Sequence, residues 1–353
     1  LVITNESVTI NATFEAKDYY LGISNETKVS VNPITTTLVL NSTNTTINGT
    51  SIIGINVTDA NDNPVNGTVN LTFTVNGNEE YSVLVNVENG IASYRYNTTD
   101  IGKVVDVTGF YVSNETLGYL GSEEEDTEFN VAKLNTTVEI DTGDLVAHQE
   151  NVATITVRNK TKDGEVDRAV PNEPVHVLIT DEHGNTLFNY TVTTNGSGSV
   201  DVPFVPITNG SVTIVADFDG NPSENVYIGN SSTKSPLSVA DIETNMTVSV
   251  ENTTINDTTS VVVNVSDVNG MPVANGTIKF VFSDGTVVDD IVVGPDNEDI
   301  TFSVDFDNTH VGKNVTVNVT FVPNDNSGYA KCSVDDTEFN VAKLNTTVEI
   351  DTG

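Results

Sequence analysis

The chain has 353 residues and carries 14 basic against 50 acidic side chains, a formal net charge of −36. So acidic a chain could not neutralise phosphates and would be repelled by anionic lipid, which excludes nucleic acid and electrostatic membrane docking. Trp is absent, aromatic residues are 7% of the chain, and the 37% of hydrophobic residues are mostly Val and Ile. This composition favours thin two-layer sandwiches over one large core.

No apolar run approaches about 18 residues, so we predict no membrane span in this segment. The chain begins inside a predicted domain, so its lack of a signal peptide says nothing about export. Its single cysteine, Cys332, excludes a disulfide framework. No activating cluster of basic residues surrounds Cys332, so we interpret it as an inert thiol in the loop before a last strand.

One stretch organises the chain because it occurs twice. Residues 126–143 read DTEFNVAKLNTTVEIDTG, and residues 336–353 repeat them without a difference, 210 positions later. An exact copy of 18 residues indicates a duplicated array, and a fixed period decides the architecture. We interpret the first half of the stretch as the last strand of one unit and the second half as the first strand of the next.

Weaker copies of this boundary divide the rest of the chain. Each combines an aromatic residue, a loop and a tyrosine: Phe14 with Tyr20, Phe110 with Tyr119, Phe218 with Tyr227, and Phe321 with Tyr329. New units then open at Ile34, Leu134, Ile242 and Leu344, so each unit holds about 100 residues, the size of one immunoglobulin-like sandwich. We predict the end of a preceding domain in 1–33, whole domains in 34–133, 134–241 and 242–343, and the first strand of a following domain in 344–353.

The unit 242–343 shows the strand pattern most clearly. Val315, Val317 and Val319 alternate with polar residues, and this period of two indicates strands with one buried face. The predicted strands are 245–251, 258–266, 275–282, 286–293, 298–306, 313–322 and 336–343, with a hairpin turn at 283–286. The predicted fold class is therefore all-β, with tandem immunoglobulin-like antiparallel sandwiches in an elongated array.

The middle unit departs from this pattern. Residues 159–174 read NKTKDGEVDRAVPNEP, a polar segment with two prolines. We interpret the whole segment as a longer surface loop.

The strongest local signal is the glycosylation motif Asn-x-Ser/Thr, which occurs at 25 of 44 asparagines. The 74 Ser and Thr residues would produce about 9 such motifs by chance. The alternation of polar and apolar residues along strands produces some of these motifs, but it does not explain motifs in loops such as Asn195-Gly196-Ser197. We therefore expect N-glycans on an exported chain. The candidate acceptors are Asn41, Asn56, Asn70, Asn97, Asn114, Asn135, Asn159, Asn189, Asn195, Asn230, Asn252, Asn264, Asn314 and Asn318.

An acidic segment between the second and third strands of the first whole unit is a weak metal candidate. Asp59, Asn61, Asp62 and Asn63 resemble the calcium linker of cadherins, but they lie inside a unit instead of between two. The counterpart at 267–272 lacks two of the polar residues. A chain reversal rich in Asp, Asn and Pro is therefore the favoured interpretation, and calcium the alternative.

Catalysis has little support in the sequence, and we expect no enzyme activity and no cofactor. The four histidines are His148, His176, His183 and His310, and none has metal-ligand spacing. No serine lies in a nucleophile elbow. We interpret all four histidines as structural, with His183 in a turn between strands.

Two segments carry a resemblance to known repeats. Residues 58–73 and 266–282 share D-x-N-x-x-P-V, a spacer and Gly-Thr, and resemble the bacterial Ig-like repeats of invasin- and intimin-type adhesins. The tyrosine cluster before residues 129–133 makes the chain similar to adhesin-like surface proteins of methanogenic archaea. The resemblance implies an extracellular, cell-surface stalk or fibre for adhesion, and it transfers no binding residue.

The partners implied are neighbouring Ig-like domains of the same long chain, N-glycans, and other cells or further copies in a fibre. The alternative function is a set of carbohydrate-binding or accessory Ig-like modules beside a surface enzyme. That function would need a platform of exposed aromatic residues, for which ten Tyr and no Trp give little material. The incomplete units at both ends favour a window from a longer array over completion by strand addition from another subunit.

Overall fold

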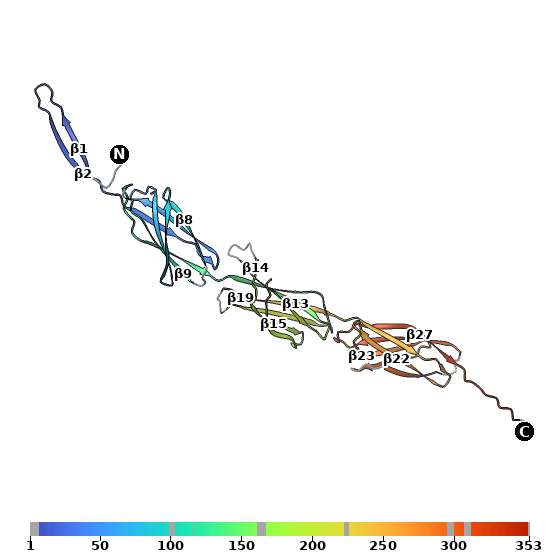
Figure 1. Ribbon diagram of the computed structural model, residues 1–353. Coiled ribbons are helices and arrows are strands. Elements are labelled where there is room, and N and C mark those ends of the chain that lie inside the picture. Colours follow the sequence, from blue (N-terminus) through green and yellow to red (C-terminus); the bar gives the residue numbers. More distant parts are fainter. Residues whose placement is uncertain are drawn as a thin grey trace. The chain divides into compact units, whose positions relative to one another are not determined.

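The structure, a computed structural model, describes residues 7–98, 103–114, 116–160, 167–221, 226–294, 300–306 and 312–351. Every regular element in these ranges is a β-strand (Figure 1). They contain no helix that could cross a bilayer. The chain forms two compact units: Leu1–Thr137 with Arg158–Arg168 and Asp219–Asn230, and Val138–Val157 with Ala169–Phe218 and Ser231–Gly353.

The first described element is an antiparallel hairpin of β1 (Ser7–Phe14) and β2 (Ile23–Ser30) (Figure 1). Every residue of the two strands is exposed. Ile10, Phe14 and Ile23 are among the exposed large apolar side chains, at 50%, 51% and 70%.

Eight strands in residues 36–132 form two sheets, named here the N-terminal sandwich. One sheet has the order β3 (Thr36–Asn41), β5 (Thr50–Asp59), β8 (Ile91–Asn97). The other has the order β4 (Thr45–Thr46), β10 (Glu125–Ala132), β9 (Val104–Tyr111), β6 (Gly67–Val75), β7 (Asn78–Val87).

The two sheets share one apolar core, and alternation along the strands supplies it. Ile53, Ile55 and Val57 of β5 are buried while the residues between them face outward. Leu71 of β6 and Phe129 of β10 enter the same core from the second sheet. Because successive side chains of a strand point to opposite faces, the period-two pattern leads directly to this two-layer packing.

The C-terminal sandwich, residues 244–342, repeats this arrangement. Its sheets have the orders β20 (Thr244–Val250), β22 (Thr258–Asp267), β25 (Ile300–Asp305), and β21 (Thr253–Thr254), β27 (Cys332–Ala342), β26 (Asn314–Pro323), β23 (Gly276–Phe282), β24 (Val287–Val293). Each of the seven predicted strands overlaps one of these, and the predicted turn at 283–286 separates β23 from β24.

Two details of that prediction were wrong. The two-residue strand β21 was missed, because it is too short to show any periodicity. Cys332 is the first residue of β27 and does not lie in a loop, since the last strand begins four residues earlier than predicted. Its pairing with Phe321 of β26 extends the strand to this point.

The middle sandwich covers residues 135–240. One sheet has the order β11 (Asn135–Thr142), β13 (Asn151–Lys160), β14 (Asp167–Ala169), with β17 (Ser199–Phe204) also paired to β13. The other has the order β12 (Leu145–Val146), β19 (Ile228–Ala240), β18 (Ser211–Gly220), β15 (Pro174–Asp181), β16 (Thr186–Thr193).

The predicted loop 159–174 needs correction. Asn159 and Lys160 belong to β13, residues 167–169 form β14, and Val170 is fully buried. Residues 161–166 lie outside the described part of the chain. The polar composition hid these strand residues because a short strand contributes only one or two buried side chains.

The strand order is that of an immunoglobulin-like sandwich. In each sandwich the first strand is divided between the sheets. β3 and β20 pair antiparallel in the smaller sheet, where β11 lies beside β13. The two-residue strands β4, β12 and β21 pair parallel with the last strand. In each sandwich the chain also passes between the two sheets after the strand that precedes the hairpin, as from β5 to β6, and again on either side of the strand that follows it, as from β7 to β8 and from β8 to β9.

An aromatic residue at or near the end of the penultimate strand is buried in every sandwich, but in the first unit it is not the phenylalanine of the boundary pattern. Tyr111, Phe218 and Phe321 are almost fully buried, whereas Phe110, the aromatic residue of the boundary pattern in the first unit, is 38% exposed. Tyr111 pairs with Val69 at the position where Phe321 pairs with Ile278. A shift of one residue reverses the face of a strand, so the choice between adjacent aromatics depends on pairing register.

Candidate functional site

A set of three hydrogen bonds fixes the first strand of the N-terminal sandwich to the loop before its last strand. The Ile34 amide donates to Gly118 O (2.9 Å), and the Leu120 amide donates to Ile34 O (2.9 Å). The Thr36 hydroxyl donates to Leu120 O (2.9 Å). We call this arrangement the first-strand clamp.

The clamp recurs in the other two sandwiches. In the middle sandwich Leu134 N donates to Val226 O, Ile228 N to Leu134 O, and Thr136 Oγ1 to Ile228 O at 2.6 Å. In the C-terminal sandwich Ile242 N donates to Gly328 O, Ala330 N to Ile242 O, and Thr244 Oγ1 to Ala330 O at 2.8 Å. The boundary tyrosines Tyr119, Tyr227 and Tyr329 lie at the centre of the three clamps, each in a parallel bridge with the opening Ile or Leu.

The connections from one sandwich to the next are short, and each contains one buried apolar residue. Only Lys133 and Leu134 separate β10 from β11, and Leu134 is 9% exposed. Three residues separate β19 from β20, and the central one, Ile242, is 1% exposed. In each of these two connections the buried residue also belongs to the sandwich that follows, so no flexible linker separates the strands on either side.

Within the second compact unit, a side chain of the middle sandwich also contacts a clamp of the C-terminal sandwich. The His148 and Tyr329 rings stack with centroids 4.1 Å apart, and His148 Nε2 lies 2.7 Å from Ser327 O. Burial raises the pKa of the Tyr329 phenol, with a smaller contribution from the charge of Asp267. The histidine thus has a packing role at the junction between two sandwiches.

The candidate glycan acceptors fall into three groups by exposure. Those on exposed positions are Asn41, Asn56, Asn97, Asn135, Asn189, Asn195, Asn230, Asn252, Asn264 and Asn314. Asn70, Asn114 and Asn318 are half-buried. Asn159 is only 4% exposed within β13, so a sugar there would have to displace packed atoms, and we leave it out of the proposal below.

The acidic segment considered for calcium forms a tight turn. One carboxylate oxygen of Asp59 accepts the backbone N–H groups of Asn61 (2.8 Å) and Asn63 (2.9 Å). The Asn63 side chain donates to both carboxylate oxygens, and Asp62 takes a left-handed conformation with φ 62°. Hydrogen bonds from the Asn63 amide, and more weakly from its side chain and Asn61, lower the pKa of Asp59 against the opposing effect of burial.

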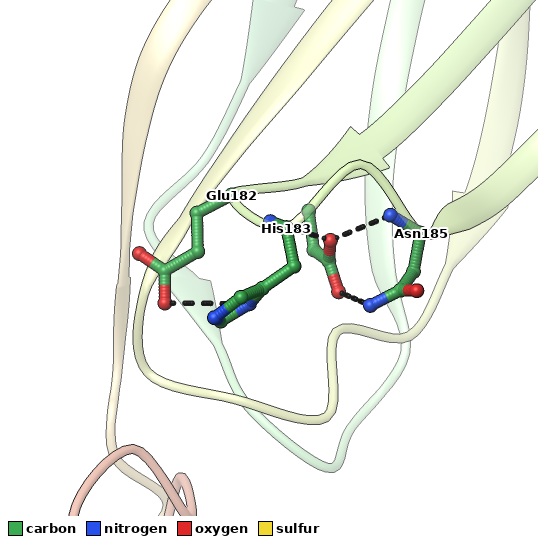
Figure 2. A network of polar contacts seen from close by, with 4 residues as sticks. Glu182, His183 and Asn185 are labelled. Atoms are coloured by element: carbon green, nitrogen blue, oxygen red, sulfur yellow. Dashed lines mark hydrogen bonds and ion pairs between the residues drawn. The ribbon is translucent and has the colours of Figure 1, made fainter.

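The same turn recurs elsewhere. Asp181 accepts the backbone N–H groups of His183 and Asn185 through one oxygen and the Asn185 side chain through the other, at 2.9, 2.8 and 2.7 Å (Figure 2). Asp267 accepts two backbone N–H groups in the counterpart of the Asp59 turn. In all three turns the carboxylate faces N–H donors, and not other oxygens as a calcium site would require.

The remaining candidates lie apart from one another. His176 and His183 belong to β15 and to the turn after it, and His310 lies outside the described residues. Cys332 is half-buried, and burial raises the pKa of its thiol against a weaker opposing hydrogen bond with Thr244. Among the residues that the structure describes, no group of three or more His, Cys, Asp or Glu side chains could hold a metal ion.

Sequence reasoning missed the clamp threonines and the role of His148. A signal for the clamp was present, because Thr36, Thr136 and Thr244 each stand two residues after the opening Ile or Leu. Nothing in the sequence connects His148 with Tyr329, 181 positions later.

No protein-family model matches the sequence, and a search among curated proteins finds no significant match. The solved structures that are similar to the chain include two adhesion proteins. One is the Escherichia coli adhesin FdeC, at 17% identity and a TM-score of 0.27, with 87% of this chain and 96% of that chain covered. The other is a tetra-tandem repeat in the extending region of a large adhesion protein, at 19% identity and a TM-score of 0.30, with 95% and 83% covered.

Both TM-scores are too low to carry an argument about this chain. Its own strand order and repeated clamp define the class: an all-β protein built of immunoglobulin-like sandwiches.

Proposed function

We propose that the chain is a non-catalytic part of a cell-surface, adhesin-like repeat array, in which successive sandwiches set the distance between an anchor and a binding tip. The observation that carries the proposal is the junction. Leu134 and Ile242 connect one sandwich to the next and are at the same time buried in the clamp of the following sandwich. A short connection that is packed into the next sandwich restricts the orientation of neighbouring sandwiches, whereas a flexible linker would not.

The proposed domains are 34–133, 134–241 and 242–343, each opening at the residue that enters a clamp. The net charge of −36 on the chain would keep an extended, exposed protein soluble. The exposed Asn-x-Ser/Thr motifs would accept N-glycans on an extracellular protein. The array would then work through reach and spacing, with other cells or further copies as the final partners.

Small-angle X-ray scattering on the whole chain tests the mechanical part. We expect an extended particle whose maximum dimension does not change with salt, because the clamps are made of backbone hydrogen bonds. A compact globular particle would contradict the proposal. Leu134→Gly keeps the backbone hydrogen bonds of the clamp but removes its buried side chain and frees the backbone, so it should broaden the distribution of dimensions. Leu84→Gly, at a 65% exposed position of β7 outside the clamps, serves as the control.

The glycans need a separate test. Mass spectrometry of protein from its native cells should find sugars on the exposed sequons and none on Asn159. If every sequon is bare, the glycosylated surface array is wrong; protein from an ordinary bacterial host would not be a fair sample. A glycan-array screen distinguishes the alternative function, since specific binding would indicate a carbohydrate-binding module set.

A further inference from the structure

Each sandwich has an equivalent strand at one end of its larger sheet. These strands are β7, β16 and β24, and each pairs on one side only with the strand before it among the described residues. An end strand presents unpaired N–H and C=O groups that another chain can use, so folded proteins protect such edges, most simply with charge.

Two of the three edges have that protection in their sequences. β7 contains the adjacent acids Glu79 and Glu80, and β24 contains Asp290 and Asp289, the second of which pairs with Lys279 of β23 at 2.6 Å. β16 reads TLFNYTVT and holds no charged residue. Its aromatic and β-branched residues also have high strand propensity, which makes β16 the edge best suited to pairing with another strand.

The exposed side chains of β16 strengthen this contrast. Tyr190 pairs with fully buried Val177, yet its own side chain is 68% exposed and contacts Phe188 edge to face at 5.3 Å between centroids. An uncharged edge with an exposed aromatic residue offers both backbone hydrogen bonds and apolar area to a partner.

A sequon lies at the centre of the same strand. Asn189 is exposed and is followed by Tyr190 and Thr191, which completes Asn-x-Thr. Its amide oxygen lies 2.9 Å from His176 Nε2, which donates to it in the tautomer that carries the proton there. The hydrogen bond turns Nδ2, the atom that takes an N-linked sugar, to the side away from His176.

We propose that a sugar on Asn189 protects the β16 edge in place of charge, and that without it two copies of the chain pair through β16 in an antiparallel dimer. This rests on the proposed glycosylation. A second copy is the fitting occupant because a strand paired antiparallel with itself obeys two-fold symmetry. Two β16 edges can also meet without the like-charge contact that a pair of β7 edges would make.

The edge itself is tested on unglycosylated full-length chain from a bacterial host by sedimentation equilibrium. We expect a concentration-dependent dimer that strengthens with salt, because salt screens the repulsion between two chains of charge −36. Asn189→Asp places a charge on each edge and should weaken the dimer at least about tenfold. Leu84→Asp, at a 65% exposed position of the already charged β7, is the matched control and should have no effect.

A chain that stays monomeric at every concentration and salt, or a dimer equally weakened by Leu84→Asp and Asn189→Asp, would overturn the pairing. The sugar is tested in a host that glycosylates Asn-x-Thr. Wild type should be monomeric there and Thr191→Ala should dimerise. If mass spectrometry finds Asn189 bare in a monomeric wild type, the protecting role is wrong even where other sequons carry sugars and the proposed function stands.

Discussion

The imidazole ring of His148 lies parallel to the phenol ring of Tyr329, with 6° between their planes and 4.1 Å between centroids. His148 holds a left-handed backbone conformation, φ 56°, which disfavours most side chains. The equivalent turns of the other sandwiches place Asn48 and Asn256 there, at φ 54° and 61°. Asparagine adopts this conformation more readily than histidine. The stacking contact with Tyr329 therefore accounts for the presence of histidine at this position.

This stack should stabilise the junction. His148→Asn keeps the favoured backbone but removes the ring contact and the hydrogen bond to Ser327 O. We expect a loss of about 1–2 kcal/mol in the free energy of unfolding. Amide exchange at residues 327–330 should become faster, while exchange in β22 stays the same. Unchanged exchange in that loop would show that the stack is incidental.

The duplicated segment provides a control for the clamp threonine. Thr136 and Thr346 lie in identical sequences, but Thr136 is 5% exposed and donates to Ile228 O, whereas Thr346 is exposed. Thr136→Val should cost about 1 kcal/mol of stability, because Ile228 O loses its hydroxyl donor. Thr346→Val should cost nothing measurable in chemical denaturation. Equal effects would mean that the cost comes from local sequence and not from the clamp.

Gly276 lies against the ring of buried Phe321, and a Cβ there would overlap the ring. Gly67 has the same relation to Tyr111. Gly276→Ala should therefore destabilise the C-terminal sandwich by about 1–3 kcal/mol through overpacking. Gly143→Ala is the control, since nothing lies within 4 Å of a Cβ at that position. A denaturation midpoint unchanged by Gly276→Ala would contradict this packing.

The Asp181 turn should make stability depend on acid. The side-chain hydrogen bond from Asn185, with backbone donors of Asn185 and His183, lowers the pKa of Asp181 despite burial. A lowered pKa in the folded state stabilises the fold above the unfolded value of about 3.9, and this contribution is lost as pH falls through the folded value.

Asp181→Asn removes the titrating carboxylate and with it this pH dependence. The turn itself should remain, because an amide oxygen can still accept the backbone donors, as Asn195 does from Ser197 and Ser199. The difference in thermal midpoint between wild type and Asp181→Asn should therefore be present at pH 6 and shrink below pH about 4. Asp144→Asn, on an exposed position, is the control. A difference that is constant across this range would exclude the carboxylate as its cause.

The sequence alone determined the longer strands of the C-terminal sandwich and the hairpin turn between β23 and β24, although not the short strands β14 and β21. Val315, Val317 and Val319 alternate with polar residues, and the structure buries all three. The turns could also be predicted, because Asp and Gly residues in a chain reversal supply local hydrogen bonds for its backbone N–H groups, as Asp181 does for His183 and Asn185. These features are local, and a local pattern can be detected without knowledge of the fold.

Only the tertiary structure decided which residues meet. Pairing register selects Tyr111 over Phe110 for the core, and sheet packing buries Asn159 although its motif matches those of exposed asparagines. The stack of His148 on Tyr329 and the free edge of β16 depend likewise on strands far apart in the chain. Local alternation fixes that a strand has an inner face, but the neighbours on that face come from long-range pairing, which leaves no periodic trace in the sequence.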